Sequence, residues 1–319
     1  MLRGLDLFCG AGGSSRGAKM AGIDIVGAID VWDLAEKTYS DNFPSTRFYR
    51  DRCETLSPAA IKRQIGAIDI LLASPECTSH TCAKGASPRS EASRGTAFEV
   101  VRYAEVFRPR WLVVENVVHM RSWRRFRTWL NAIARLGYNT RTQVLNAADF
   151  GVPQTRRRFI LTADLKRVPP LVVASPLPRV PVARLIDSEN GYHYTPLHKK
   201  GRAKPTLTRA QRAIRALGDR EPFLIVYYGS DGAGGWQRID RPLRTITTVD
   251  RFGYVRPSDD GYELRMLQVP ELKRAMGFPE EHIFSQGTRR DKIKLIGNAV
   301  CPPVMKTVIE VLTTPNVSN

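Results

Sequence analysis

The segment IDILLASPECTSHTCAK, from Ile68 to Lys84, joins an apolar run to a proline, an acid and a cysteine. The run predicts a strand buried on both faces, as in a parallel sheet, formed by Ile68, Ile70, Leu71, Leu72 and Ala73. Ligands of such sheets gather at the carboxyl ends of the strands. We therefore expect Cys77 at an active-site edge. A second interpretation stays open here, because most free cysteines are small buried hydrophobes.

Short apolar runs alternate with helical patterns on both sides of this strand. Further strands are expected at Leu2–Phe8, Ile23–Ile29, Phe48–Asp51, Trp111–Val114, Thr142–Leu145 and Phe159–Thr162. Helices are expected at Arg16–Ala21, Leu34–Phe43, Pro58–Ile65, Thr96–Phe107 and Arg121–Leu136. This alternation implies an α/β fold with a doubly wound parallel sheet.

The first expected strand runs into a glycine-rich loop, Cys9–Ser15, that opens a helix. Such a loop lets backbone N–H groups approach a ligand. The next strand ends at Asp30, about twenty residues past the glycines, where an acid can bind the two hydroxyls of a ribose. The loop lacks both the full dinucleotide fingerprint and the lysine of a phosphate-binding loop. A nucleoside cofactor without a pyrophosphate, such as S-adenosylmethionine, therefore fits better than NAD or ATP.

Two further features belong to the same expected edge. Glu115 follows the apolar run Trp111–Val114, so an acid and Cys77 end two neighbouring strands. Arg156 and Arg158 occupy alternate positions leading into a strand, which predicts that they point to one face and can clamp a phosphate or a base edge.

The chain is strongly basic, with 49 lysines and arginines against 31 aspartates and glutamates in 319 residues, a formal net charge of +18. This excess indicates a polyanionic partner, with nucleic acid favoured over an acidic membrane surface or a generically basic soluble protein. Five irregularly spaced cysteines and no signal-like leader predict a reduced, cytoplasmic protein. No unbroken apolar run approaches the eighteen or so residues of a membrane span, so we expect none.

Composition changes after Asp164. Residues 168–181 contain five prolines, and residues 166–220 carry twelve basic residues against three acids. We predict a catalytic and cofactor-binding domain over residues 1–164, a small, basic, largely irregular module over 165–258, and a return segment over 259–319 that completes the first domain. The return segment is expected to hold helices at Arg265–Phe278 and Val304–Leu312. A lid or a dimerisation domain is the alternative interpretation of the middle module.

With these residues assembled, the sequence resembles the DNA (cytosine-5) methyltransferase family over nearly its whole length. Six segments match in the family's order: DLFCGAGG at 6–13, SPEC at 74–77, ENV at 115–117, QTRRR at 154–158, GFP at 277–279 and GNAV at 297–300. Each is weak alone, and the shared order is the specific signal. The resemblance implies a Rossmann-like, S-adenosylmethionine-dependent methyltransferase sheet, with the middle module as target-recognition domain. It also implies a monomer that acts on double-stranded DNA in the cytoplasm, either bacterial or phage-encoded, in restriction-modification or as an orphan enzyme.

The resemblance also implies residue roles. Cys77 would add to C6 of a flipped cytosine, because C5 is a weak nucleophile until a thiolate attacks. Glu115 would hydrogen-bond N3 and the exocyclic amine, and Arg156 and Arg158 would hold O2 and position Cys77. The implied cofactor residues are Phe8, Gly10 and Gly12 in the loop, Asp30 at the ribose, Asp51 at the adenine amine and Asn298 in the pocket. The polar loop after Cys77 would close over the base.

One residue departs from the family, which usually has Pro-Pro-Cys where this chain has Pro75-Glu76-Cys77. A carboxylate beside Cys77 would raise the pKa of its thiol, so we predict that Glu76 is paired with an arginine or lysine. Cys77, His80 and Cys82 share a metal-like spacing, but without a fourth ligand nearby we predict no metal site. The remaining cysteines, Cys9, Cys53 and Cys301, are expected to be structural.

Two alternatives remain at this point. One is a tRNA cytosine-5 methyltransferase on the same fold, because a recognition module favours DNA without excluding RNA. The other is a sequence-specific DNA-binding protein with little turnover, for which Glu76 is the only hint.

Overall fold

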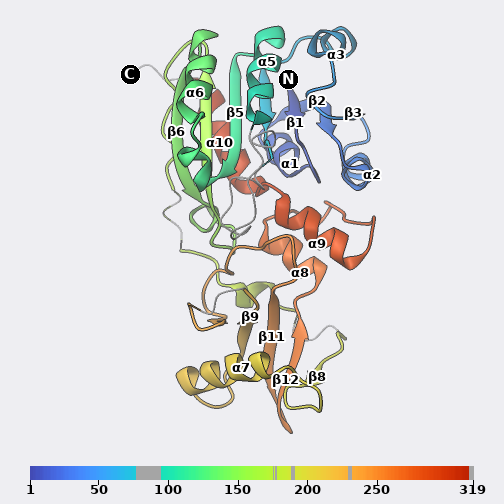
Figure 1. Ribbon diagram of the computed structural model, residues 1–319, viewed down its shortest axis with the longest axis vertical. Helices are drawn as coiled ribbons and strands as arrows, with labels where there is room; N and C mark the ends of the chain where they lie inside the picture. The colour runs from blue at the N-terminus through green and yellow to red at the C-terminus, as the bar shows by residue number, and fades with distance from the viewer. Residues whose placement is uncertain (77–94, 175, 177, 188–190, 229–231, 316–319) are drawn as a thin grey trace.

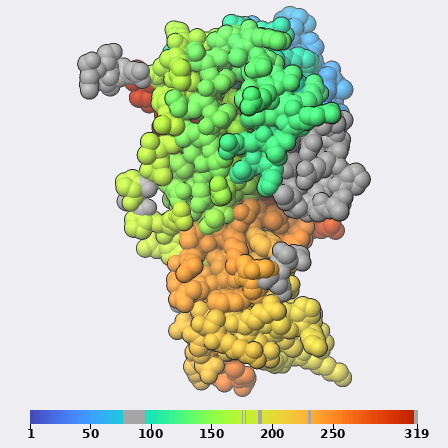
Figure 2. Space-filling view, turned by 60° about the vertical axis from the view of Figure 1, so that its left-hand side comes forward, coloured from blue at the N-terminus to red at the C-terminus, as the bar shows by residue number. Residues whose placement is uncertain are grey.

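The computed structural model describes residues 1–76, 95–174, 176, 178–187, 191–228 and 232–315. The described chain forms two lobes stacked along the long axis of the molecule (Figure 1). The first lobe is built on a seven-stranded sheet and the second on a five-stranded sheet. Figure 2 shows the second lobe, in yellow and orange, below the first.

The sheet of the first lobe has the strand order β3-β2-β1-β4-β5-β7-β6. Its strands are β1 (Leu2–Leu7), β2 (Ile23–Asp30), β3 (Arg47–Arg50), β4 (Ile70–Ala73), β5 (Trp111–Val117), β6 (Asn139–Asn146) and β7 (Arg157–Asp164). The five strands from β3 to β5 are parallel, which confirms the predicted α/β fold. Strand β7 differs, because it runs antiparallel to both β5 and β6. The link from β6 to β7 is short and holds only the 3-10 helix η3 (Ala147–Phe150). Parallel neighbours need a longer crossover connection, so β6 and β7 pair antiparallel.

Strand β4 is buried on both faces, as its apolar run predicts. Ile70 and Leu72 belong to the hydrophobic core that contains residues of α1 and α10, whereas Leu71 and Ala73 belong to the core that contains residues of α3, α5 and α6. All four side chains are fully buried. Helices therefore cover both faces of the sheet, and only its strand ends are left for chemistry.

The helices of this lobe are α1 (Gly13–Met20), α2 (Asp33–Asn42), α3 (Pro58–Ile65), α5 (Ala97–Phe107), α6 (Phe126–Arg135), α9 (Arg289–Asn298) and α10 (Pro302–Thr313). The single helix predicted over Arg121–Leu136 is wrong at its start. A short 3-10 helix, η2 (Val118–Ser122), comes first, and α6 begins only at Phe126. Trp123 separates the two elements in an extended conformation, with its side chain buried.

The end of the chain returns to the first lobe. Helix α10 packs on α1 so closely that a Cβ at Gly17 would lie 2.6 Å from the carbonyl oxygen of Pro302. Residues Arg289–Thr313 are long and apolar enough by composition to cross a membrane, but 67% of that window is buried inside the protein. Helices α9 and α10 meet within it at an extended break, so we interpret the stretch as core.

The second lobe contains a small sheet and one helix, while more than half of the described residues from 165 to 258 lie outside helices and strands, as the predicted largely irregular module requires. Its antiparallel strands are β8 (Thr195–Pro196), β9 (Phe223–Val226), β10 (Trp236–Arg238), β11 (Phe252–Ser258) and β12 (Gly261–Met266), and α7 (Lys204–Leu217) packs beside them. Helix α7 escaped prediction because its buried face consists of small residues, Thr206, Ala210 and Ala213, among many basic ones. The 3-10 helix η4 (Val182–Leu185) precedes this sheet.

The predicted boundary after residue 258 is also wrong, because it divides the hairpin of β11 and β12. Arg265 lies in β12, and the helix expected from that residue begins later as α8 (Val269–Ala275). Arg265 reaches across to α8 in a buried, bidentate ion pair with Glu271, with nitrogen–oxygen distances of 2.7 and 2.8 Å. The second lobe is thereby tied to the return segment.

Candidate active site

The carboxyl ends of β1 to β5 open into one cavity of about 200 Å³. Residues from each of these strand ends and from the break after α9 line it. They include Phe8, Gly10, Asp30, Asp51, Ser74, Glu76, Glu115 and Asn298. The structure thus brings five of the six predicted cofactor residues to one cavity, together with the predicted acid Glu115.

The loop after β1 has a backbone that few residues adopt. Phe8 has a φ of 58° although it carries a side chain, and Gly10 follows with a φ of 51°. A non-glycine residue in this region costs on the order of 1 kcal/mol, and such strain clusters at ligand sites. A Cβ at Gly10 would have no protein atom within 4 Å, so the glycine leaves free space beside the cavity.

Gly12 differs from the prediction, since it is not among the residues that line the cavity. It precedes α1 with a φ of 81°, and a Cβ there would lie 2.5 Å from the Phe43 ring. Gly12 is therefore required by the turn and by its close approach to α2, and we assign it no contact with a cofactor.

Asp30 ends β2 and holds the loop in place. Its Oδ2 accepts a hydrogen bond from the Gly10 N–H at 2.9 Å, and its Oδ1 accepts one from the Trp32 N–H at 3.0 Å. Burial raises the pKa of the Asp30 carboxyl, and these N–H groups oppose that shift. Asp51 is exposed and follows the end of β3, the strand next to β2. The hydrogen bond from the Thr55 hydroxyl is the main cause that lowers the pKa of the Asp51 carboxyl.

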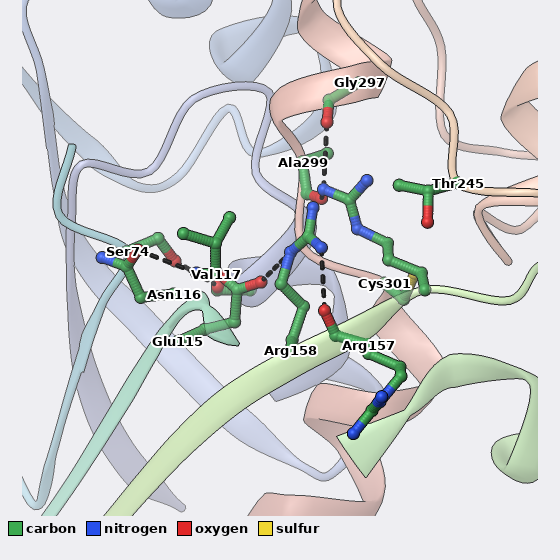
Figure 3. A network of polar contacts seen from close by, with 12 residues as sticks. Ser74, Glu115, Asn116, Val117, Arg157, Arg158, Thr245, Gly297, Ala299 and Cys301 are labelled. Carbon is green, nitrogen blue, oxygen red and sulfur yellow. Dashed lines mark hydrogen bonds and ion pairs between the residues drawn. The ribbon is translucent and has the colours of Figure 1, made fainter. Parts of the chain in front are cut away.

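Glu115 lies within β5 and is a buried acid at this edge of the sheet. It is 7% exposed, and its Oε1 lies 3.0 Å from Nε of Arg158 on the adjacent strand β7. Burial raises the pKa of the Glu115 carboxyl, with Arg158 and then Arg156 opposing the shift. Figure 3 shows the Arg158 guanidinium between this carboxylate and the carbonyl oxygen of Arg157. The pair offers a buried acid whose proton affinity is tuned by a neighbouring cation.

Asn116 is a site residue that our sequence reasoning missed. Its buried side chain donates from Nδ2 to the carbonyl oxygen of Pro75 at 3.0 Å, while its Oδ1 accepts from the Val117 N–H at 2.8 Å. Strand β5 thereby holds the segment that leads from β4 to Cys77. The ENV match contained this residue, but its partner is 41 positions away along the chain.

Arg156 lines one small cavity together with Arg158 and Glu115, but its guanidinium is bonded to backbone carbonyl oxygens, which differs from the expectation that both arginines clamp a base. It precedes β7, is 3% exposed, and donates to the carbonyl oxygens of Ile246, Gly297 and Ala299 at 2.9 to 3.0 Å. The alternate spacing brings both side chains to one cavity, but it does not reveal the carbonyl partners of Arg156, which belong to distant segments of the chain. Arg156 connects the second lobe to the break after α9 instead.

Cys77 and the Cys77, His80 and Cys82 spacing lie outside the described residues, so both remain predictions. Cys9, Cys53 and Cys301 are buried free thiols, and burial raises the pKa of each, to about 11 for Cys301. Glu76 is exposed, and no ion pair within 4.0 Å joins it to another residue in the described parts of the chain. The predicted pairing of Glu76 is therefore not found there.

The family model for C-5 cytosine-specific DNA methylases matches residues 2–314. The chain belongs to this family. It is similar to the Type II methyltransferase M.HindV of Haemophilus influenzae, at 29% identity over 93% of this chain and 91% of the relative. It is also similar to M1.HphI of Haemophilus parahaemolyticus, at 27% identity over 98% of this chain and 87% of the relative.

The fold has solved counterparts as well. A DNMT2 mutant from Spodoptera frugiperda superimposes with a TM-score of 0.71 at 16% identity, covering 98% of this chain and all of the other. The cytosine methylase family and these relatives show that the chain is a DNA (cytosine-5) methyltransferase enzyme.

A second hollow of about 760 Å³ lies on the second lobe of this methyltransferase. Its lining is basic and includes Arg179, Arg238, Arg241, Arg244 and Trp236, with Thr155 from the first lobe. Two of these cations are committed to acids, since Arg179 pairs with Asp149 and Arg238 with Asp240. Among the described residues no cluster of three or more metal-binding side chains occurs.

Proposed function

We propose that this enzyme transfers a methyl group from S-adenosylmethionine to C5 of a flipped cytosine in a specific duplex DNA site, through a covalent adduct of Cys77 at C6. The observation that carries the proposal is the shared cavity. A buried acid–arginine pair, suited to a base, lies at the same strand edge as two carboxylates suited to a nucleoside. Base chemistry and cofactor chemistry therefore meet in one place.

The described residues fit the proposed cofactor. Asp30 keeps carboxylate lone pairs for ribose hydroxyls beyond its two backbone hydrogen bonds, and Asp51 offers an acceptor for an adenine amine. Gly10 leaves room that a side chain would fill, and Asn298 at the end of α9 lines the other side. When bound, S-adenosylmethionine supplies an electrophilic methyl group on a positively charged sulfur.

Glu115 is proposed to hold the proton that the reaction needs at N3. Because burial raises the pKa of this carboxyl, Glu115 can share a proton with the ring nitrogen as the thiolate attacks. Arg158 is proposed to hold the base at O2 and to keep Glu115 in place. Arg156 is proposed as a positioning residue, since its donors are already used within the protein.

The Cys77 thiolate forms a bond to C6, and the displaced ring electrons are stabilised by the proton shared between Glu115 and N3. C5 would then take the methyl group that bound S-adenosylmethionine supplies, with the electron pair of the carbon–sulfur bond left on the donor's sulfur. The C5 proton leaves to solvent, the bond to Cys77 breaks, and the aromatic ring is restored.

The second lobe is proposed to recognise the target. C6 is stacked inside duplex DNA, so the cytosine must leave the helix before Cys77 can reach it. The basic hollow beside β10 and the net charge of +18 would supply phosphate contacts, which are independent of sequence. We further propose that residues 1–164 and 267–319 form the catalytic domain, with the recognition domain between them.

The biological setting is proposed from the relatives. M.HindV and M1.HphI are Type II methyltransferases of bacteria. We propose that this enzyme likewise acts as a monomer in the cytoplasm of a bacterium, or of a host when encoded by a phage, with a role in restriction-modification.

The test is to incubate the enzyme with methyl-labelled S-adenosylmethionine and either unmethylated genomic DNA or bulk tRNA. Label that appears as 5-methylcytosine in DNA supports the proposal, and Cys77→Ser should abolish it while Cys82→Ser, a matched change in the same segment, should not. Label only in tRNA would show that the substrate is RNA and not DNA. DNA binding without label in either would instead support a DNA-binding protein with little turnover.

A further inference from the structure

The cofactor cavity is acidic although the whole protein is strongly basic. Among the described residues that line it, five carboxylates face a single arginine, Arg52: Asp30, Asp51, Glu54, Glu76 and Glu115. In a chain of net charge +18 this local excess of negative charge suggests that the cavity prefers a cation.

Four of these carboxylates are compensated by the protein. Glu115 pairs with Arg158 and Glu54 with Arg52, each at 3.0 Å. Asp30 accepts two backbone N–H bonds, and Asp51 accepts from its own neighbours Arg52 and Thr55. In contrast, within the part of the chain that the structure describes, Glu76 has no hydrogen bond or ion pair through its carboxylate. Its interactions there are longer-range ones, repulsion from Asp30 and attraction to Arg52.

Sheet order places Glu76 between the two ends of the cavity. Along the carboxyl edge, the strand ends follow one another as β3 with Asp51, β2 with Asp30, β1 with Gly10, β4 with Glu76 and β5 with Glu115. The nucleoside is proposed to lie toward the first two and the cytosine toward the last. A methyl group that passes between them must start from a sulfur in the region of β1 and β4, which is where Glu76 lies.

We propose that Glu76 is a specificity-determining residue that favours the cationic methyl donor over its neutral thioether product. This rests on the proposed use of S-adenosylmethionine. The donor carries one positive charge more than S-adenosylhomocysteine, and that charge is on the sulfur. A free carboxylate nearby stabilises only the charged sulfur, so substrate is retained and product is released. The proline that is usual in the family at this position has no charge to do so.

The test is equilibrium binding by calorimetry, with S-adenosylmethionine and S-adenosylhomocysteine as separate probes and without DNA. From Coulomb's law for an exposed carboxylate a few ångström from a unit positive charge in a medium of water-like dielectric constant, Glu76→Gln should lower the donor-to-product affinity ratio by about three- to tenfold. The loss should lie in donor binding, with product binding unchanged. Because salt screens such a charge, the ratio of the unmodified protein should fall as sodium chloride rises from about 0.05 M to about 0.5 M, and that of Glu76→Gln should not.

Two further variants sharpen the result. Glu76→Pro removes the same charge with a different shape and should show the same ratio as Glu76→Gln. Asp24→Asn changes the net charge equally at the opposite end of β2, on an exposed side chain, and should leave the ratio unchanged. Equal effects on both probes, or no effect in any Glu76 variant, would overturn the proposal. Failure of the unmodified protein to bind either probe would instead overturn the proposed cofactor.

Discussion

Glu115 must meet two requirements at the scale of a single residue. It has to be buried enough to hold a proton near neutral pH, and it must still be oriented toward the substrate. Burial within β5 raises the pKa of its carboxyl, and the Arg158 guanidinium 3.0 Å away limits that rise. The sequence could indicate the acid, since it follows an apolar run, but not this balance, because Arg158 is 43 residues distant.

Replacing Glu115 by glutamine removes the transferable proton but keeps the shape. We expect kcat to fall by a factor of about 10² to 10⁴, the usual contribution of a general acid, with S-adenosylmethionine affinity unchanged. Glu99→Gln, on α5 and paired with Arg102, is the control and should retain activity. Steady-state methylation assays measure kcat for both variants. A normal kcat for Glu115→Gln would show that Glu115 is not the general acid of the reaction.

Asn116→Asp tests whether the link to Pro75 positions Cys77. The change is nearly isosteric, but it replaces the donor of the 3.0 Å hydrogen bond with an acceptor that repels the Pro75 carbonyl. We expect about a tenfold slower formation of the covalent complex with DNA containing 5-fluorocytosine, in keeping with the roughly 1–3 kcal/mol cost of an unmade buried hydrogen bond. Unaltered trapping kinetics would show that the link has no part in positioning.

At the scale of elements, the site depends on segments that meet from distant parts of the chain. Arg156 leads into β7, Ile246 belongs to the second lobe, and Gly297 and Ala299 frame Asn298 at the end of α9. A Cβ at Gly297 would lie 2.2 Å from the carbonyl oxygen of Thr247, so glycine is required for this approach. Motif matching located these segments separately, whereas their junction is a product of folding.

Arg156→Ala should therefore destabilise the protein and weaken cofactor binding together. Three buried carbonyl oxygens would lose their donor, and at roughly 1–3 kcal/mol for an unsatisfied group we expect a loss of at least about 2 kcal/mol. Urea unfolding followed by tryptophan fluorescence measures it. Arg157→Ala is the matched control, because that neighbouring residue is exposed, and it should stay within about 0.5 kcal/mol of the unmodified protein.

At the scale of the whole molecule, His282 makes stability depend on pH. This fully buried side chain accepts from Arg16 Nε at 3.2 Å and packs against the rings of Phe43, Phe278 and Phe284. Burial, followed by the charge of Arg16, lowers the pKa of His282 to about 3. Below the ordinary value of 6.5 the unfolded chain binds a proton that the folded chain does not, so stability falls as pH falls from 6.5 toward 3.

The contribution of His282 should amount to about 1.4 kcal/mol per pH unit below pH 6.5. His282→Gln keeps an acceptor for Arg16 but does not titrate, so it should flatten the fall in unfolding free energy between pH 6 and pH 5 by about that amount. His198→Gln, at an exposed histidine, should keep the original slope. Equal slopes in all three proteins, measured by urea unfolding, would contradict the assignment to His282.

The sequence by itself determined the parts of this protein that local chemistry controls. Apolar runs marked strands β1, β2 and β4, glycines marked the loop after β1, and the acids Asp30 and Glu115 followed the apolar runs of β2 and β5. These are properties of neighbouring residues, so a linear reading can find them. Six short motifs in one order were enough to predict the family that the match over residues 2–314 then confirmed.

Only the tertiary structure decided how those parts are combined. The antiparallel β7, the sheet of the second lobe and the different partners of Arg156 and Arg158 all depend on pairings between distant segments. The Asn116–Pro75 hydrogen bond and the position of Glu76 at the cavity also depend on segments that are distant along the chain. The physical reason is that burial and electrostatic environment are set by what a side chain meets in space, and a sequence specifies only what precedes and follows it.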